Sequence, residues 1–178
     1  PPAHEGYVGE LATVPGRVAT EDHEVIGERL WREAAARLNV PRDLRNDVST
    51  LVLNHMVSTN KRSGPVWVRR QRVRLGDELL SDLLMHRACD LTGKGAKVAL
   101  DQLGAIQALE TARKDAQEAG VPAGVKDLKV TGFDAQEAGL TGRAIGAALK
   151  AVLDEVVCDP AGQKLTREWQ LTALGRLA

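Results

Sequence analysis

The sequence predicts an all-α protein, a helical bundle followed by a small helical module. Apolar residues recur three and four positions apart along most of the 178-residue chain, which is the spacing of one helix face. Short stretches rich in glycine, proline, asparagine or aspartate separate these periodic segments. No segment alternates between apolar and polar residues for long, and the run Val66–Val68 is too short to predict a strand.

The N-terminal part is expected to be a loop followed by two helices. Residues 1–20 are rich in glycine and proline, which predicts a loop. From Asp22 onward an apolar stripe predicts a helix, and Pro41 suits the start of the next one, because a first turn leaves its N–H groups unpaired in any case. The first stripe consists of Ile26, Leu30, Ala34 and Leu38, and the second helix carries Leu44, Val48, Leu51, Val52 and His55 on one face.

The middle of the chain is expected to contain two further helices after a basic segment. Residues 59–65 predict a loop, and residues 66–75 are basic and partly helical. Asp77 is expected to cap the next helix, which ends at Gly93 and turns four leucines inward. A longer and more polar helix is predicted over residues 96–119.

The last third is expected to be a separate small module. The segment Gly120–Gly124 predicts a loop or linker, so the domains are placed at residues 1–119 and 125–178. In the second domain a short helical turn opens at Thr131. Thr141 and Thr166 are expected to cap the two helices that follow it.

Charge and composition narrow the classes of function. Hydrophobic residues make up 43% and charged residues 27% of the chain, which is typical of a folded globular protein. Aromatic residues make up only 3%, which argues against a surface that stacks single-stranded bases. The net charge is zero, yet residues 48–76 contain no acidic residue and would attract phosphate, unless they only form a solvated basic face. The basic residues of this window are Lys61, Arg62, Arg69, Arg70, Arg72 and Arg74.

Cysteine usage and hydropathy bear on localisation. Cys89 and Cys158 fit neither a metal-binding spacing nor a disulfide framework, so a reducing cytoplasm is expected. The sequence contains no long apolar run and no signal peptide, so we expect neither a membrane partner nor export.

Three residues are candidate metal ligands. His23 opens the first helix, His55 follows the apolar face of the second, and Asp90 lies seven residues after Leu83 on the face of a third. Imidazole and carboxylate groups suit divalent transition metals, and paired metals can generate hydroxide and neutralise a phosphate. The alternative is structural: His55 as a hydrogen-bonded core residue and Asp90 as a cap or an ion-pair partner.

A second candidate site binds anions at a helix N-terminus. Thr141, Gly142 and Arg143 open a predicted helix, where backbone N–H groups and the helix dipole favour negative charge. A plain capping turn is the alternative interpretation.

Several segments, in the same order, resemble motifs in the C-terminal half of bacterial CCA-adding enzymes and poly(A) polymerases. Asp22–Gly27 resembles a Gly-His-Glu-x-x-Gly helix start of their HD domain, and Leu53–Met56 resembles its His-His-Met. Arg72–Leu84 resembles an arginine-rich turn with a leucine-rich helix, and Arg87–Leu91 resembles Arg-Ala-Asp-Leu, interrupted by Cys89. Val130–Gly146 resembles the tail motif Thr-Gly-x-Asp…Gly-Leu-x-Gly-x-x-Ile-Gly, and Thr166–Glu168 resembles part of Asn-Thr-Arg-Glu.

The resemblance implies an HD-like helical bundle with a helical tail that helps to hold tRNA. It also implies that His23, His55 and Asp90 are ligands of a divalent metal such as Mg, Mn, Ni or Zn. The His-Asp doublet of HD domains and the nucleotidyltransferase head are absent, so the chain is expected to add no nucleotides itself. It would correspond to the half of the enzyme that follows an upstream nucleotidyltransferase domain. With three donors only, metal binding is expected to be weak.

Two alternatives stay open from sequence. The chain could be a stand-alone HD phosphohydrolase that acts on nucleotides or cyclic phosphodiesters, in which case it is a metal-dependent enzyme. It could also be a degenerate, purely structural helical module. A His-Asp doublet just upstream of Pro1 would favour the hydrolase, and a nucleotidyltransferase head further upstream would favour the CCA-adding family.

Overall fold

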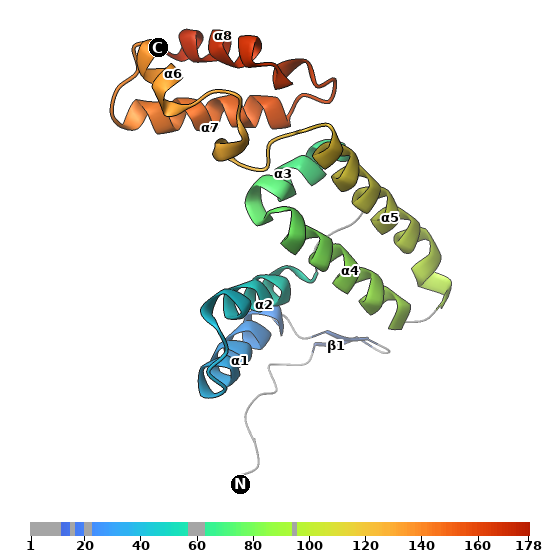
Figure 1. The fold of residues 1–178 in the computed structure, drawn as a ribbon. Helices are drawn as coiled ribbons and strands as arrows, with labels where there is room; N and C mark the ends of the chain where they lie inside the picture. Colours follow the sequence, from blue (N-terminus) through green and yellow to red (C-terminus); the bar gives the residue numbers. More distant parts are fainter. Residues whose placement is uncertain (1–11, 15–16, 20–22, 57–62, 94–95) are drawn as a thin grey trace. The chain divides into compact units, whose positions relative to one another are not determined.

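A computed structural model describes residues 12–14, 17–19, 23–56, 63–93 and 96–178 of the chain (Figure 1). Eight α-helices account for most of these residues, which confirms the predicted all-α class. The chain divides into two compact units, Pro1–Val57 and Ser58–Ala178, called here the N-terminal and the C-terminal unit. Neither boundary of the predicted domains, at residues 119 and 125, coincides with this division.

A short two-stranded ribbon precedes the helices of the N-terminal unit. Strands β1 (Ala12–Val14) and β2 (Arg17–Ala19) pair antiparallel, with Ala12 opposite Ala19 and Val14 opposite Arg17. The prediction of a loop over residues 1–20 is therefore wrong for these two segments. Strands of three residues are too short to show the alternation on which strand prediction depends.

Helices α1 (His23–Arg37) and α2 (Arg42–Asn54) form an antiparallel hairpin in the same unit. The turn between them places Asn39 in the left-handed region, with φ at 52°, a conformation that asparagine tolerates better than most residues. Among the described side chains of this unit, Ala35 is the one apolar residue that is fully buried. Leu38, which was predicted to continue the α1 stripe, lies in the turn and is 74% exposed. The hairpin therefore has a thin apolar core.

The C-terminal unit begins with three packed helices. They are α3 (Pro65–Leu75), α4 (Asp77–Gly93) and α5 (Ala96–Glu118), as Figure 1 shows. The basic segment predicted to be partly helical is helical throughout its length. The core between the three helices is built from Val68, Leu80, Leu84, Leu91, Ile106 and Leu109.

Asp77 has a different role from the predicted cap. It is the first residue of α4, and its carboxylate accepts two hydrogen bonds from the Arg72 guanidinium at 2.7 and 2.8 Å. A third bond joins Arg72 to the carbonyl of Val121, and Arg113 of α5 also reaches Asp77. Gly76, with φ at 84°, makes the sharp turn between α3 and α4 that brings the pair together.

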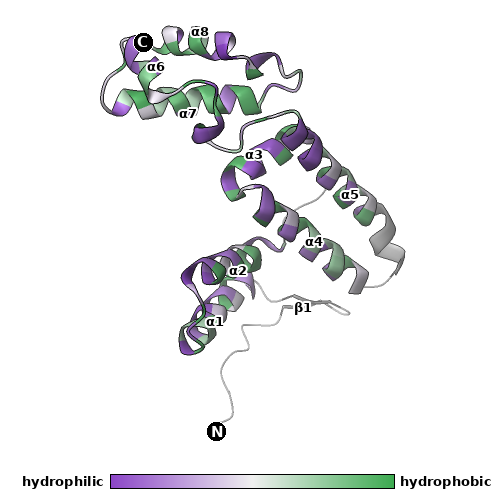
Figure 2. Cartoon of the chain, viewed as in Figure 1, coloured by the Kyte–Doolittle hydropathy of each residue, from purple (hydrophilic) through white to green (hydrophobic). Residues whose placement is uncertain are grey.

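The predicted tail module lies in the same compact unit and contains three α-helices and two single 3₁₀ turns. These are η1 (Val125–Asp127), α6 (Gly132–Glu137), α7 (Arg143–Val157), η2 (Gln163–Leu165) and α8 (Arg167–Leu177). Apolar residues run along one face of α7, which forms the centre of a second core with Val130 and Leu174 (Figure 2). Val73 of α3 packs against this core, so the module is joined to α3 by apolar contact.

Of the two caps predicted in this module, the one at Thr166 is confirmed and the one at Thr141 is wrong. Thr131 forms a reciprocal capping box with Asp134 at the start of α6, and the Thr166 side chain accepts from Trp169 N at the start of α8. Thr141 does not cap α7, because Gly142 is the N-cap residue and no side chain completes it.

Candidate functional site

His23 and His55 meet at the open end of the α1–α2 hairpin. His23 is the first residue of α1 and His55 directly follows α2, so the antiparallel arrangement places them side by side. Their Nε2 atoms are 3.0 Å apart and their ring centroids 4.9 Å apart, with the ring planes at 74°. The structure thus brings together two of the three predicted metal ligands.

The other nitrogen of each ring has its own partner. His55 Nδ1 lies 2.6 Å from the carbonyl oxygen of Val52, which accepts a hydrogen bond from it. His23 Nδ1 lies 3.3 Å from a carboxylate oxygen of Glu24. With its Nδ1 protonated toward Val52, neutral His55 directs the Nε2 lone pair at His23.

This arrangement fits a divalent metal. Two imidazole nitrogens bound to one tetrahedral zinc are about 3.3 Å apart, given Zn–N bonds of about 2.0–2.1 Å, so a gap of 3.0 Å needs only a small opening. Histidines that bind metal usually donate their second N–H to a carboxylate or a backbone carbonyl, and Glu24 and Val52 provide one of each.

Asp90, the third predicted ligand, belongs to the C-terminal unit. It lies in the second half of α4 and accepts a hydrogen bond of 2.7 Å from Arg87, one helical turn earlier. In the part of the chain that the structure describes, no group of three His, Cys, Asp or Glu side chains is close enough to hold a metal ion. That Asp90 joins His23 and His55 as a metal ligand stays a prediction.

Several basic residues in the window 48–76 make contacts within the protein. Arg72 is 3% exposed, and its guanidinium donates hydrogen bonds to Asp77 and to the Val121 carbonyl. It therefore supports the fold and cannot reach a phosphate. Arg69 donates to the carbonyl of Asp159, just after α7. Arg74 is exposed in the last turn of α3. Lys61 and Arg62 lie outside the described residues.

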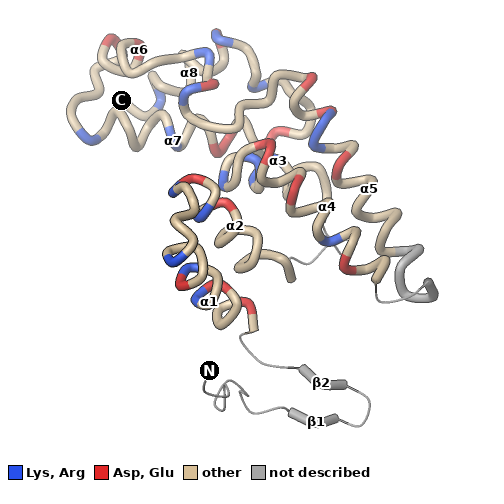
Figure 3. The backbone as a smooth tube through the Cα atoms, turned by 60° about the horizontal axis from the view of Figure 1, so that its bottom comes forward, with Lys and Arg blue, Asp and Glu red and all other residues tan. Residues whose placement is uncertain are grey.

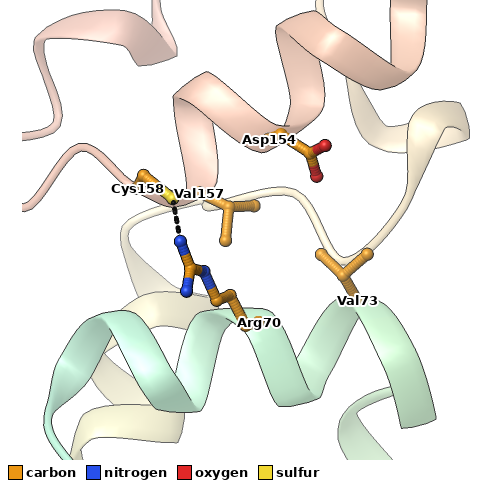
Figure 4. Close-up of a pocket in the computed structure, with 5 residues that line it drawn as sticks. All are labelled: Arg70, Val73, Asp154, Val157 and Cys158. Atoms are coloured by element: carbon orange, nitrogen blue, oxygen red, sulfur yellow. Dashed lines mark hydrogen bonds between the residues drawn. The ribbon is translucent and has the colours of Figure 1, made fainter. Parts of the chain in front are cut away.

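Arg70 points across a pocket of about 380 Å³ between α3 and α7 (Figure 4). Its Nη2 atom donates to the Cys158 sulfur at 3.2 Å. The other residues that line the pocket are Val73, Asp154 and Val157. Since Arg69 and Arg70 both bind the end of α7, they tie the predicted tail module to α3.

The start of α7 has the form predicted for an anion site. Thr141, Gly142 and Arg143 are all exposed, and Gly142 has φ at 53°, which glycine adopts without strain. No side chain caps α7, and the residues at its N-terminus are exposed. The positive end of the helix dipole is therefore accessible at the surface. Anion binding at this helix start stays a prediction.

Two segments that carry the family resemblance meet in one structural cluster. Asp134 accepts hydrogen bonds from Thr131 N and Thr131 Oγ1 at 2.7 and 2.8 Å and forms an ion pair with Arg167. The hydrogen bonds from Thr131 and the charge of Arg167 hold the pKa of Asp134 below its ordinary value. Thr131, Asp134 and Arg167 therefore stabilise the tail module itself, by joining the start of α6 to the start of α8.

A basic and aromatic cluster on the tail module was missed from sequence. Lys164 and Arg176 lie over the Trp169 ring, at 4.8 and 5.3 Å from its centroid, and both also approach Glu155. The spacing from Trp169 to Arg176 is two helical turns, so their common face could have been read from the sequence. The position of Lys164 depends on the η2 turn.

None of the helices described in the structure is both long and apolar enough to cross a membrane. Compared with models of protein families, with curated proteins and with solved structures, the chain gives no match.

Proposed function

We propose that this chain is the HD-like, RNA-binding part of a protein resembling CCA-adding enzymes and poly(A) polymerases. The observation that carries the proposal is the tail module. Its Thr-Gly-x-Asp and Thr-Arg-Glu segments, 33 residues apart, meet in the Asp134–Arg167 ion pair. The two glycines of its Gly-Leu-x-Gly segment, Gly139 and Gly142, both have positive φ, which only glycine adopts freely.

The RNA would be held through its phosphates by exposed cations. Arg74 of α3 and Arg143 of α7 are exposed members of the predicted set, and Lys61 and Arg62 remain predicted contacts. Arg72 is excluded as a phosphate contact because it is buried. Arg69 and Arg70 donate hydrogen bonds to Asp159 and Cys158, next to the end of α7, and so link α3 to α7. Contacts of this kind position RNA without reading its sequence.

A tRNA titration at several salt concentrations tests the proposal. Replacing Arg74 and Arg143 together by alanine should weaken binding and reduce the slope of log affinity against log salt by roughly 0.7–0.9 per lost phosphate contact. The double variant Arg37→Ala/Arg42→Ala is a matched control, because both residues are exposed on α1 and α2, where charges of both signs are interspersed (Figure 3). Affinity that is indifferent to salt and to Arg74 and Arg143 would contradict RNA binding by this surface.

The proposal includes a weak divalent-metal site at His23 and His55, with Asp90 as the third predicted ligand. The support for it is the approach of the two Nε2 atoms to 3.0 Å. A metal bound there would supply a Lewis acid for phosphate. The histidines would hold it, while Glu24 and the Val52 carbonyl orient their rings.

A further inference from the structure

The His23–His55 pair lies at the open end of the α1–α2 hairpin, whose fully buried core is small. It joins residues 32 positions apart at the end of the hairpin opposite the Asn39 turn. Between these two points, the described residues bury Ala35 and Ser49, both small. Larger apolar side chains, such as Leu44 at 53% and Leu53 at 43%, stay exposed. The fully buried core of the hairpin is therefore small, and half-buried side chains such as Val52 add to it, as does a hydrogen bond of 3.0 Å from Trp31 Nε1 to the Arg45 carbonyl.

We propose that a divalent transition metal bridges His23 and His55 as a clasp on the open end of the α1–α2 hairpin, with Glu24 as the positioning residue for His23. The inference rests on the metal site of the proposed function and goes beyond it, because it assigns the metal a structural effect. A ligand that binds only the folded hairpin stabilises it by RT ln(1 + L/Kd), where L is the free ligand concentration.

The ring geometry makes the pair ready for a metal. The two Nε2 atoms are already 3.0 Å apart, and both Nδ1 atoms are held from outside, by Glu24 at 3.3 Å and by the Val52 carbonyl at 2.6 Å. Binding thus requires only a small separation of the Nε2 atoms and the loss of one proton between them. Because Val52 acts through its backbone, Glu24 is the partner that mutation can test.

Hydrogen exchange of the whole chain, read by mass spectrometry with and without Zn²⁺ or Ni²⁺, tests the clasp. At a metal concentration about five times the dissociation constant, exchange of α1 and α2 amides should slow about six-fold. In His55→Ala and His23→Ala the metal should leave this exchange unchanged. His86→Ala, which removes a histidine of the C-terminal unit, should respond as the wild type does.

Glu24→Gln tests the positioning role. It should raise the metal concentration needed for half of the effect by about 10- to 100-fold, the usual cost of losing an outer partner of a metal ligand. Glu33→Gln is the matched control, since Glu33 is an exposed carboxylate later in the same helix. Equal midpoints for the two variants would overturn the role of Glu24.

Calorimetry on the same samples separates this inference from the proposed metal site. Heats that disappear in His55→Ala, without slower exchange in α1 and α2, would overturn the clasp and leave the metal site standing. The absence of such heats would remove both the metal site and the clasp, while RNA binding, measured by tRNA titration, would be unaffected. Slower exchange that persists in His55→Ala would also overturn the clasp.

Discussion

At the scale of single residues, Arg72 illustrates how burial decides what a charge can do. Its guanidinium is 3% exposed and bonded on three sides, by both oxygens of Asp77 and by the Val121 carbonyl. Arginine suits such a place because its planar fork matches a carboxylate. Two residues later, Arg74 is exposed in the same helix.

Replacing Arg72 by alanine should therefore destabilise the C-terminal unit by about 3–5 kcal/mol, since it leaves Asp77 without its main partner. Arg72→Lys should recover only part of the loss, because an ammonium cannot bond both oxygens in the same way. Arg74→Ala should cost about 0–1 kcal/mol. Urea unfolding followed by circular dichroism measures all three. Equal midpoints for Arg72→Ala and Arg74→Ala would show that the buried network contributes nothing.

At the scale of elements, the helices differ in what makes them stable. Helix α7 buries six residues along one face and needs no side-chain cap. Helix α6 has only six residues, too few to be stable by helix propensity alone. The capping box between Thr131 and Asp134, together with the ion pair of Asp134 with Arg167, gives this short helix the stability that its length does not provide.

Thr131→Ala should accordingly cost about 0.5–2 kcal/mol, the usual range for a lost N-cap. Hydrogen exchange of the α6 amides should become faster than that of α7. Thr172→Ala is the control, because Thr172 is exposed within α8 and its hydroxyl only bonds back to the Glu168 carbonyl. That change should be neutral or slightly stabilising, because alanine is the better helix former. Similar losses in both variants would argue against a special role of the cap.

At the scale of the whole molecule, acid should weaken the C-terminal unit. Hydrogen bonds from Arg72 lower the pKa of Asp77 below its ordinary 3.8, and hydrogen bonds from Arg113 lower the pKa of Glu110 below its ordinary 4.5. A carboxyl group with a lowered pKa in the folded state adds stability above its unfolded pKa and loses it as the pH falls through the folded value.

The urea midpoint should therefore be nearly constant from about pH 7 to 5 and fall below about pH 4.5. The double variant Asp77→Asn/Glu110→Gln should be less stable at neutral pH and show a flatter profile. Glu118→Gln is a control with one exposed carboxyl group removed from the end of α5. A double variant whose midpoint falls with acid as steeply as the wild type would show that other carboxyl groups dominate.

The features that could be predicted from the sequence depend on neighbours along the chain. Helix periodicity, the helix start at Thr131 and the cap at Thr166 follow from local backbone geometry. The packing of distant helices determines which arginine turns inward, because Arg72 meets Val121 49 residues away and Arg69 meets Asp159 90 residues away. It also placed the division of the chain between Val57 and Ser58. Such partners depend on how distant helices pack, and side-chain periodicity within one helix carries no information about them.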